Sequence, residues 1–344
     1  MSKIETLLER IAVALERVAD ALESKPKTKR REHYSKEVVQ ATVPSILEKP
    51  ASPKLPVKSV VEDTLANYVS SDTEEFNGDL LPRTVSVNYA KLYPHLSKFL
   101  ETRSIEISGA FTPVDPLILD EQLDDVAYFM GKNYKDLADL LAQVKVNLRS
   151  GANFVIDLGI VAAPARQVIY RLCSALYEMA FFDEYKCSDY PGYKIHLRAN
   201  NIGIVHNFFS GFWFERYVAQ EVIKVVREFA KEMNVSAEDF ELIRNARILC
   251  EDGQISRERD LLCYFNGEYY WFECKSGGNY NYVDSISSYE SFADTFKLKS
   301  ENCFLVFLSN EVYSHKSANL KMNICSSADF RNKLKEILRK NMCK

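Results

Sequence analysis

The feature that most constrains the fold is an Asn-Gly pair at positions 266 and 267, with strand-favouring runs on both sides, LLCYF and EYYWF. This pattern is a strong signal for a β-hairpin with a two-residue type I′ turn, because both turn residues need a positive φ. Such a turn fixes the pairing register of the two strands. Asp260 is then opposite Glu273, and Glu258 is opposite Lys275. Because both pairs share a parity, all four charged side chains are expected on one face of the hairpin.

The two facing carboxylates, Asp260 and Glu273, need a counter-charge. Directly opposed residues of an antiparallel pair have Cβ atoms about 4.5–5.5 Å apart, and like charges there destabilise a sheet. A divalent cation reverses the sign of that cost, because Mg²⁺ or Mn²⁺ binds carboxylates together with water and a substrate phosphate. Lys275 is two residues beyond Glu273, where its ammonium can neutralise a phosphate oxygen or orient an attacking water. The alternative is an exposed hairpin face with salt-bridged charges, but the apolar residues in both strands favour burial.

A further acid, Glu215, comes from an upstream segment with helical spacing of apolar residues. That segment begins near residue 212, and Glu215 lies in its first turns, near the positive end of the helix dipole. It can support or bind a metal, or it can be an ordinary exposed acid at a helix start. After the hairpin the pattern predicts a helix at 283–297, a buried strand at 302–309 and an amphipathic helix at 327–340. This order of elements predicts an α/β core.

These segments together resemble a known family. GFWFERYV in the helix, RERDLL in the first strand and YWFECKSGG in the second resemble the PD-(D/E)XK nuclease superfamily. Within it they resemble the nuclease half of the CRISPR ancillary nucleases that cyclic oligoadenylate activates. The resemblance implies a restriction-endonuclease-like core, a mixed sheet flanked by helices, and a metal-dependent nuclease activity. Arg259, between the two acids of the first strand, is more polar than the family pattern leads us to expect.

The resemblance also implies roles for single residues. Asp260, Glu273 and the backbone carbonyl of Cys274 are expected to hold Mg²⁺ or Mn²⁺. Lys275 is expected to serve the attacking water and the transition state. Two further acids are expected to support catalysis: Glu215 and Glu258.

The chain before this region shows no sensor domain that we recognise for a cyclic nucleotide. Residues 1–24 carry an apolar heptad repeat, which predicts a coiled-coil oligomerisation helix or, alternatively, a single amphipathic helix packed on its own domain. Residues 25–59 are basic and Pro-rich, which predicts a linker that either tethers a phosphate backbone or is a solvated spacer. Residues 60–204 are expected to form a small α+β module, either winged-helix-like, a sensor, or a domain that only packs on the nuclease. Residues 205–344 are expected to form the nuclease domain.

Composition limits the partners and the compartment. The 344 residues carry a net charge of −4, so any nucleic-acid contact must come from a local basic patch. The eight cysteines include no CxxC pair, so a structural zinc site is not expected. The N-terminus reads as a charged repeat rather than a signal peptide, and no apolar stretch has the length of a membrane span. We therefore expect a cytoplasmic protein without a membrane partner.

The leading functional hypothesis is a divalent-metal-dependent nuclease that hydrolyses phosphodiester bonds, with DNA as the favoured substrate and a homo-oligomer formed through residues 1–24. One alternative is an RNA-cutting or ligand-gated nuclease of a phage-defence system, with the module before the nuclease domain as its sensor. Another is a nucleic-acid-binding protein whose nuclease fold is inactive.

Overall fold

The computed structural model describes residues 88–110, 117–188, 192–249, 258–277, 283–311 and 322–343. All of these belong to one compact unit of the chain. The coiled coil predicted at 1–24 and the linker predicted at 25–59 lie outside the described residues, and both stay predictions.

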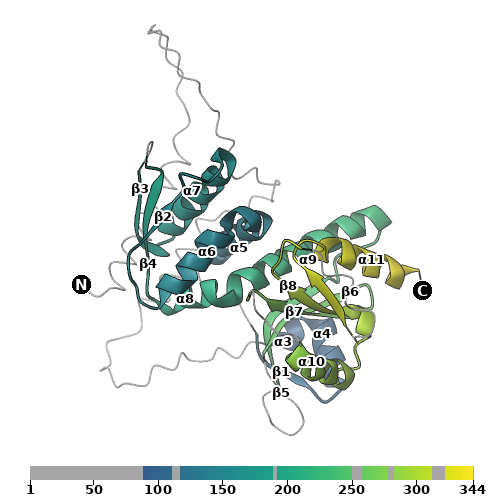
Figure 1. The fold of residues 1–344 in the computed structure, drawn as a ribbon. Helices are drawn as coiled ribbons and strands as arrows, with labels where there is room; N and C mark the ends of the chain where they lie inside the picture. Colours follow the sequence, from purple (N-terminus) through teal and green to yellow (C-terminus); the bar gives the residue numbers. More distant parts are fainter. Residues whose placement is uncertain are drawn as a thin grey trace, which may run out of the picture. The chain divides into compact units, whose positions relative to one another are not determined.

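The larger sheet has six strands in the order β1-β5-β6-β7-β8-β9 (Figure 1). Its strands are β1 (Glu106–Gly109), β5 (Glu241–Leu249), β6 (Arg259–Phe265), β7 (Glu268–Lys275), β8 (Cys303–Phe307) and β9 (Asn323–Ser326). The first three pairings are antiparallel and the last two are parallel. The expected mixed sheet of an α/β protein is therefore confirmed.

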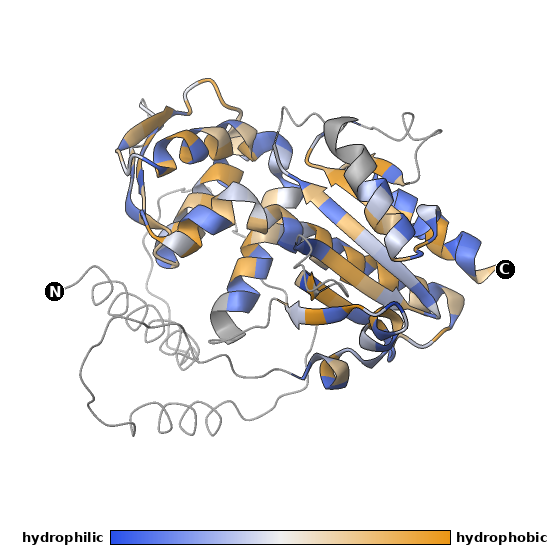
Figure 2. Ribbon diagram, turned by 90° about the horizontal axis from the view of Figure 1, so that it is seen from below, coloured by the Kyte–Doolittle hydropathy of each residue, from blue (hydrophilic) through white to orange (hydrophobic). Residues whose placement is uncertain are grey.

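Two apolar clusters hold helices against the two faces of this sheet. Helices α9 (Trp213–Met233) and α11 (Phe330–Met342) bury their apolar sides in one cluster with residues of the central strands. Helices α4 (Pro94–Glu101) and α10 (Val283–Thr295) contribute to the other cluster. Figure 2 shows the hydrophobic residues concentrated along the strands and on the sides of the helices that pack on them. Helix α10, the completely buried strand β8 and helix α11 follow the hairpin in the predicted order, while β9, which lies between β8 and α11, was not predicted.

The hairpin has the predicted register. Phe265 pairs with Glu268, and the pairing continues without a shift to Leu261 and Phe272. The turn residues have φ values of 50° at Asn266 and 81° at Gly267, which is the backbone that a type I′ turn requires. The Asn-Gly pair therefore predicted the pairing of these strands correctly.

Helix α9 has a buried apolar side and is followed by a residue in the left-handed backbone conformation. Four of its apolar residues are buried at helical spacing: Val218, Val222, Val225 and Phe229. The helix ends at Met233 and is capped by Asn234, which has a φ of 53° and a ψ of 44°, a left-handed conformation that asparagine tolerates. A short α8 (Gly203–Asn207) and a π-helical turn, η1 (Phe208–Phe212), lead directly into α9.

A second sheet lies in the part of the chain before α8. It has three antiparallel strands in the order β2-β4-β3. The elements of this region are α5 (Leu117–Lys132), α6 (Tyr134–Leu148), β2 (Phe154–Asp157), α7 (Ala163–Glu178), β3 (Phe182–Ser188) and β4 (Lys194–Ala199). Two helices and a β-ribbon are the elements on which the winged-helix-like alternative depended, and that assignment stays a prediction.

The first described elements join the larger sheet. Helix α3 (Tyr89–Leu92) and α4 precede β1, and β1 pairs with β5 at the edge of the six-stranded sheet. Helix α5, in turn, packs along α9. The division into an α+β module at 60–204 and a nuclease domain at 205–344 stays a prediction. In the described ranges, every helix is either too short or too polar to cross a membrane.

Candidate active site

The ends of β6 and β7 bring three of the predicted residues together. The Lys275 Nζ lies 2.6 Å from Glu273 Oε1 and 4.0 Å from Asp260 Oδ2. The same Asp260 oxygen accepts a hydrogen bond of 2.6 Å from the backbone N–H of Cys274. One ammonium thus lies within reach of two carboxylates from adjacent strands.

The alternation of side chains between the two faces of the sheet is interrupted where β5 pairs with the start of β6, near Asn245 and Arg259. Ile243 and Ala246 of β5 are three positions apart, yet both belong to the same apolar cluster. Asn245 between them has a φ of 51°, which interrupts the pleat. Ala246 pairs with Arg259, and the Arg259 guanidinium lies 3.8 Å from the ring centre of Phe292 in that cluster. Arg259 therefore departs from the regular alternation of side chains along β6, and the shared face of Glu258, Asp260, Glu273 and Lys275 stays a prediction.

The same interruption explains the unexpected arginine. Arg259 is only 7% exposed, and its guanidinium also lies 5.6 Å from the ring centre of Trp271. A guanidinium stacks on aromatic faces favourably when it is removed from water. Arg259 therefore belongs to the packing of the sheet against α10.

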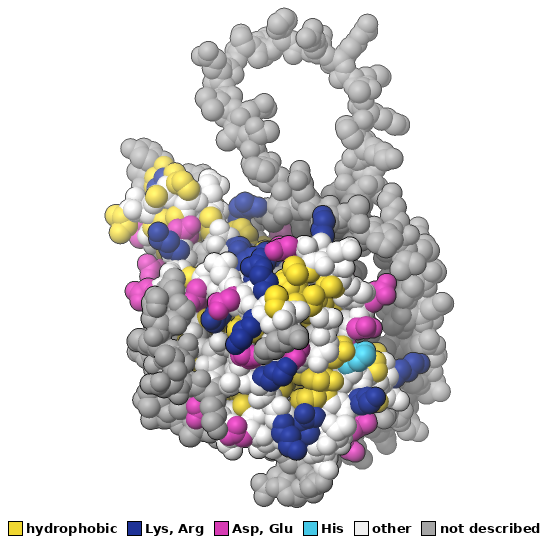
Figure 3. All heavy atoms as spheres, turned by 90° about the vertical axis from the view of Figure 1, so that its right-hand side faces the viewer, with side chains coloured by type: hydrophobic (Ala, Val, Ile, Leu, Met, Phe, Trp, Pro, Cys, Tyr) yellow, Lys and Arg dark blue, Asp and Glu magenta, His cyan; other side chains and the backbone are white. Residues whose placement is uncertain are grey.

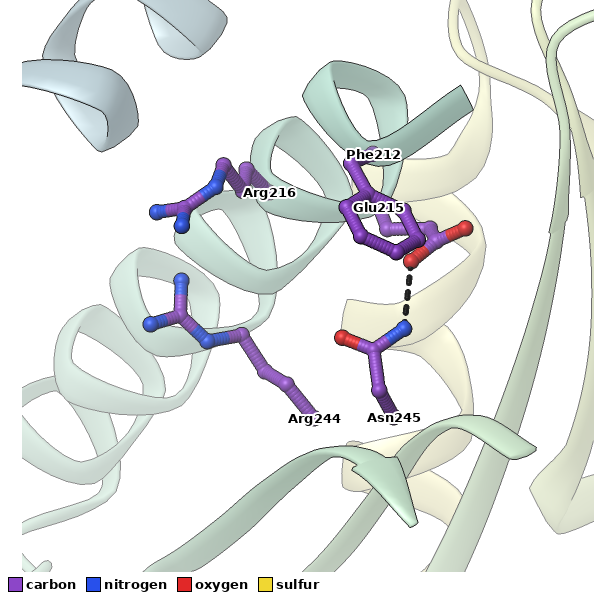
Figure 4. Close-up of a pocket in the computed structure, with 5 residues that line it drawn as sticks. All are labelled: Phe212, Glu215, Arg216, Arg244 and Asn245. Carbon is purple, nitrogen blue, oxygen red and sulfur yellow. Dashed lines mark hydrogen bonds between the residues drawn. The ribbon is translucent and has the colours of Figure 1, made fainter. Parts of the chain in front are cut away.

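Glu215 reaches the same region from the first turn of α9. Its Oε2 accepts a hydrogen bond of 2.7 Å from Asn245 Nδ2 (Figure 4). A Cβ built on Gly211 would lie 3.8 Å from both Glu215 Oε1 and Ser276 Oγ, so the η1 turn, α9 and the end of β7 meet here. Sequence reasoning missed Asn245, whose available signal was an asparagine inside a strand, a residue that tolerates the positive φ it adopts.

Glu258 lies at the edge of the cluster. Its side chain is 36% exposed, and its Oε2 lies 3.3 Å from Arg247 Nε. It is still near enough to help raise the pKa of Glu215. The structure therefore brings Glu258 to the rim of the site rather than to its centre.

The surroundings raise the pKa values of two acids and of the lysine, which favours the neutral form of the acids and the charged form of the lysine. Burial, followed by the charges of Glu273 and Glu215, raises the pKa of Asp260 well above its ordinary value. Burial also raises the pKa of Glu215, although the hydrogen bond from Asn245 opposes the rise. Burial would lower the pKa of Lys275, but Glu273 and Asp260 outweigh it and raise that pKa. The lysine is therefore kept charged in a site with an excess of acids.

One carboxylate oxygen of the cluster, Glu273 Oε2, lacks a hydrogen-bond partner. Glu273 is 6% exposed, and its Oε2 is buried without a hydrogen-bond partner. A buried carboxylate oxygen that lacks a partner is costly, and a hard cation or its bound water is a suitable one. The oxygen donors of Asp260 and Glu273 therefore fit a divalent cation such as Mg²⁺ or Mn²⁺.

Side chains alone do not complete such a site. In the part of the chain that the structure describes, no group of three His, Cys, Asp or Glu side chains is arranged to hold a metal. The Cys274 thiol is buried in the apolar cluster under α9, and burial raises its pKa well above the ordinary value. A metal would therefore have only a backbone carbonyl from this residue, together with the two carboxylates.

The chain was compared with protein families, with curated proteins and with solved structures. No protein-family model and no curated protein matches the chain. The solved structures that are similar to it include VC1899 from Vibrio cholerae, with a TM-score of 0.46, and Can2 from Sulfobacillus thermosulfidooxidans in complex with cyclic tetra-adenylate, with a TM-score of 0.43. Each is 17% identical, over 71% of this chain, and the chain spans 60% of the length of either structure.

Proposed function

We propose that this protein is a divalent-metal-dependent nuclease that hydrolyses phosphodiester bonds at the cluster of Asp260, Glu273 and Lys275. The observation that carries the proposal is a charged lysine within 4.0 Å of two carboxylates on adjacent strands, whose side chains are only 14% and 8% exposed. One of those carboxylates keeps a buried oxygen without a partner. Positive charge beside clustered oxygen donors is what a phosphodiester and its metal require.

Each residue then has a defined task. Asp260, Glu273 and the carbonyl of Cys274 would hold Mg²⁺ or Mn²⁺, which would polarise the phosphate and acidify a bound water. Lys275 neutralises a phosphate oxygen or orients the attacking water, and its raised pKa keeps it protonated for the first task. Glu215 and Glu258 add negative charge around the cation. The burial of the cluster strengthens these electrostatic interactions, since little water screens them.

The favoured substrate is DNA, and assembly through residues 1–24 would bring several such sites together, which suits cutting both strands. Net charge gives no general attraction for a polyanion, and on the face in Figure 3 basic side chains lie among acidic and apolar ones. Substrate contact therefore depends on local positive groups such as Lys275. The alternatives are an RNA-cutting or ligand-gated nuclease of a phage-defence system and an inactive nucleic-acid-binding protein.

An assay with several substrates separates these functions. Purified full-length protein is incubated with plasmid, labelled single-stranded DNA or labelled RNA, each with Mg²⁺, Mn²⁺ or a chelator, and with or without cyclic tetra-adenylate. Metal-dependent cleavage of the DNA substrates is the expected result. Cleavage of RNA alone, or only with the cyclic nucleotide, would replace the favoured function by the ligand-gated one. Binding without cleavage under every condition would leave only the inactive protein.

A further inference from the structure

A group of four charged residues lies beside the candidate site, with Asp120 and Asp124 from α5, Arg216 from α9 and Arg244 from β5. Arg216 donates to both aspartates at 2.5 Å, and Arg244 donates to both at 2.8–2.9 Å. The arginine side chains are 9% and 15% exposed, and both aspartates are 17% exposed. Gln220 of α9 adds a hydrogen bond of 3.0 Å to Asp124. Two guanidinium groups and two carboxylates thus pair with one another in a largely buried setting.

This ion-pair group adjoins the Glu215–Asn245 hydrogen bond in sequence and in space. Arg216 directly follows Glu215, and Arg244 directly precedes Asn245. All four of these residues, together with Phe212, line one small pocket. Figure 4 shows the two guanidinium groups turned toward each other, while Glu215 turns to Asn245.

The pairing in this pocket is selective. A carboxylate forms its strongest hydrogen bonds with a guanidinium, so Glu215 would be a natural partner for either arginine. Its Oε2 is instead bound by the neutral amide of Asn245. The aspartates of α5 explain this choice, because each of them engages both arginines.

We propose that Asp120 and Asp124 are positioning residues, which engage Arg216 and Arg244 so that Glu215 stays on Asn245 and faces the carboxylate cluster. Helix α5 thereby sets the position of an acid in a site to which it contributes no acid of its own. The link to catalysis rests on the proposed nuclease function, whereas the link to the position of Glu215 does not.

The position of Glu215 is tested by structure. Crystal structures of the wild type and of the double variant Asp120→Asn/Asp124→Asn are compared at the distance between Glu215 Oε2 and Asn245 Nδ2. We expect the carboxylate to leave Asn245 for the unbalanced guanidinium groups. Adding Arg216→Gln and Arg244→Gln to the double variant removes the excess charge and should return Glu215 to Asn245. A carboxylate that remains on Asn245 in the double variant overturns the proposal.

The effect on catalysis is tested by separating kcat from KM. A displacement of about 1 Å in a catalytic arrangement can cost about a hundredfold in rate. The double variant should therefore lose at least about tenfold in kcat while KM changes little, and the charge-neutral variant should recover part of the loss. The matched control is Lys132→Gln, which removes another α5–α9 ion pair, 3.6 Å from Lys132 Nζ to Glu221 Oε1, away from the pocket. An equal loss of kcat in the control would show that the ion-pair group only stabilises the packing of the helices, and it would overturn the proposal.

Circular dichroism melts establish that each variant is folded. If the double variant does not fold, Asp120→Asn and Asp124→Asn are examined singly, because each leaves one aspartate to hold both arginines. Each single variant should show a smaller displacement of Glu215 in the same direction, and no displacement in either would overturn the proposal. A wild type without cleavage activity would contradict the proposed function, while the crystal structures would still decide the position of Glu215.

Discussion

At the scale of the residue, the two central acids of the site differ in their surroundings. Glu273 has the Lys275 ammonium at 2.6 Å, whereas Asp260 has it at 4.0 Å and also feels the charges of Glu273 and Glu215. The hairpin register predicted that the two acids oppose each other, but it could not predict which of them the flexible lysine would contact. Neutralising one acid should therefore not have the same effect on stability as neutralising the other.

In the metal-free protein, Asp260→Asn should raise the free energy of unfolding by about 0.2–1 kcal/mol near neutral pH. The pKa of Asp260 is raised on folding, so its ionisation destabilises the folded state as the pH rises through the folded pKa. The advantage of the variant should therefore shrink as the pH falls toward about 4, the ordinary pKa of aspartic acid. Glu273→Gln should show no such gain, because it removes the close partner of Lys275. Melts in chelator across this pH range test both statements, and an Asp260→Asn variant that melts below wild type near neutral pH would refute the first.

Excess Mn²⁺ should reverse the order of stability. A ligand that binds only the folded state stabilises it, and the wild type keeps both carboxylates for the metal. The melting temperature of the wild type should therefore rise more than that of Asp260→Asn or Glu273→Gln. Equal shifts in all three proteins would place the metal elsewhere.

Lys275→Ala should abolish cleavage while leaving Mn²⁺ binding largely intact. The ammonium acts on phosphate or water and is not a metal ligand, so its loss removes a catalytic group and spares the carboxylates. The metal-free variant should also be less stable, because Glu273 and Asp260 lose their shared positive partner. Isothermal titration with Mn²⁺ is the measurement, and a loss of binding together with the lysine would contradict the assigned role.

At the scale of the element, local sequence patterns predicted the hairpin and the helix sides, but not the contacts between segments that are distant in the sequence. The Asn-Gly turn predicted the pairing from Phe265 to Leu261, and helical spacing predicted the buried side of α9. Neither pattern predicted that β1 would join the sheet, because its partner β5 lies more than a hundred residues away. The ion-pair group on α5 was not predicted for the same reason, because only tertiary packing brings its segments together. The interrupted pleat at Asn245 had only a weak local signal, an asparagine inside a strand.

The packing of α5 on α9 depends on a glycine. A Cβ at Gly131 would lie 2.1 Å from Cδ2 of the buried Tyr217 ring, whereas a Cβ at Gly203 of α8 would meet nothing within 4 Å. Gly131→Ala should therefore destabilise the protein by about 1–3 kcal/mol, despite the higher helix propensity of alanine. Gly203→Ala is the matched control and should be close to neutral. Denaturant unfolding measures both, and equal midpoints would contradict this packing.

At the scale of the whole molecule, the described structure is one compact unit, while the heptad repeat lies outside the described residues. Deletion of residues 1–24 should lower the oligomeric mass without unfolding this unit, because the repeat supplies an apolar seam that pairs with other copies. Light scattering gives the mass, and circular dichroism checks the fold. An unchanged mass after the deletion would exclude residues 1–24 as the main source of assembly.

The central claim is that one cluster of two carboxylates and a lysine performs metal-dependent hydrolysis. The most direct measurement is the cleavage rate of a labelled nucleic acid by wild type, Asp260→Asn, Glu273→Gln and Lys275→Ala, with Mg²⁺ and with chelator. The matched control is Glu268→Gln, an acid at the turn end of the same hairpin that is bound to Lys299 and Asn302. We expect cleavage by wild type and control with Mg²⁺ alone, and a loss of at least about a hundredfold in the three site variants. Cleavage that persists in those three variants, or in chelator, would contradict the claim.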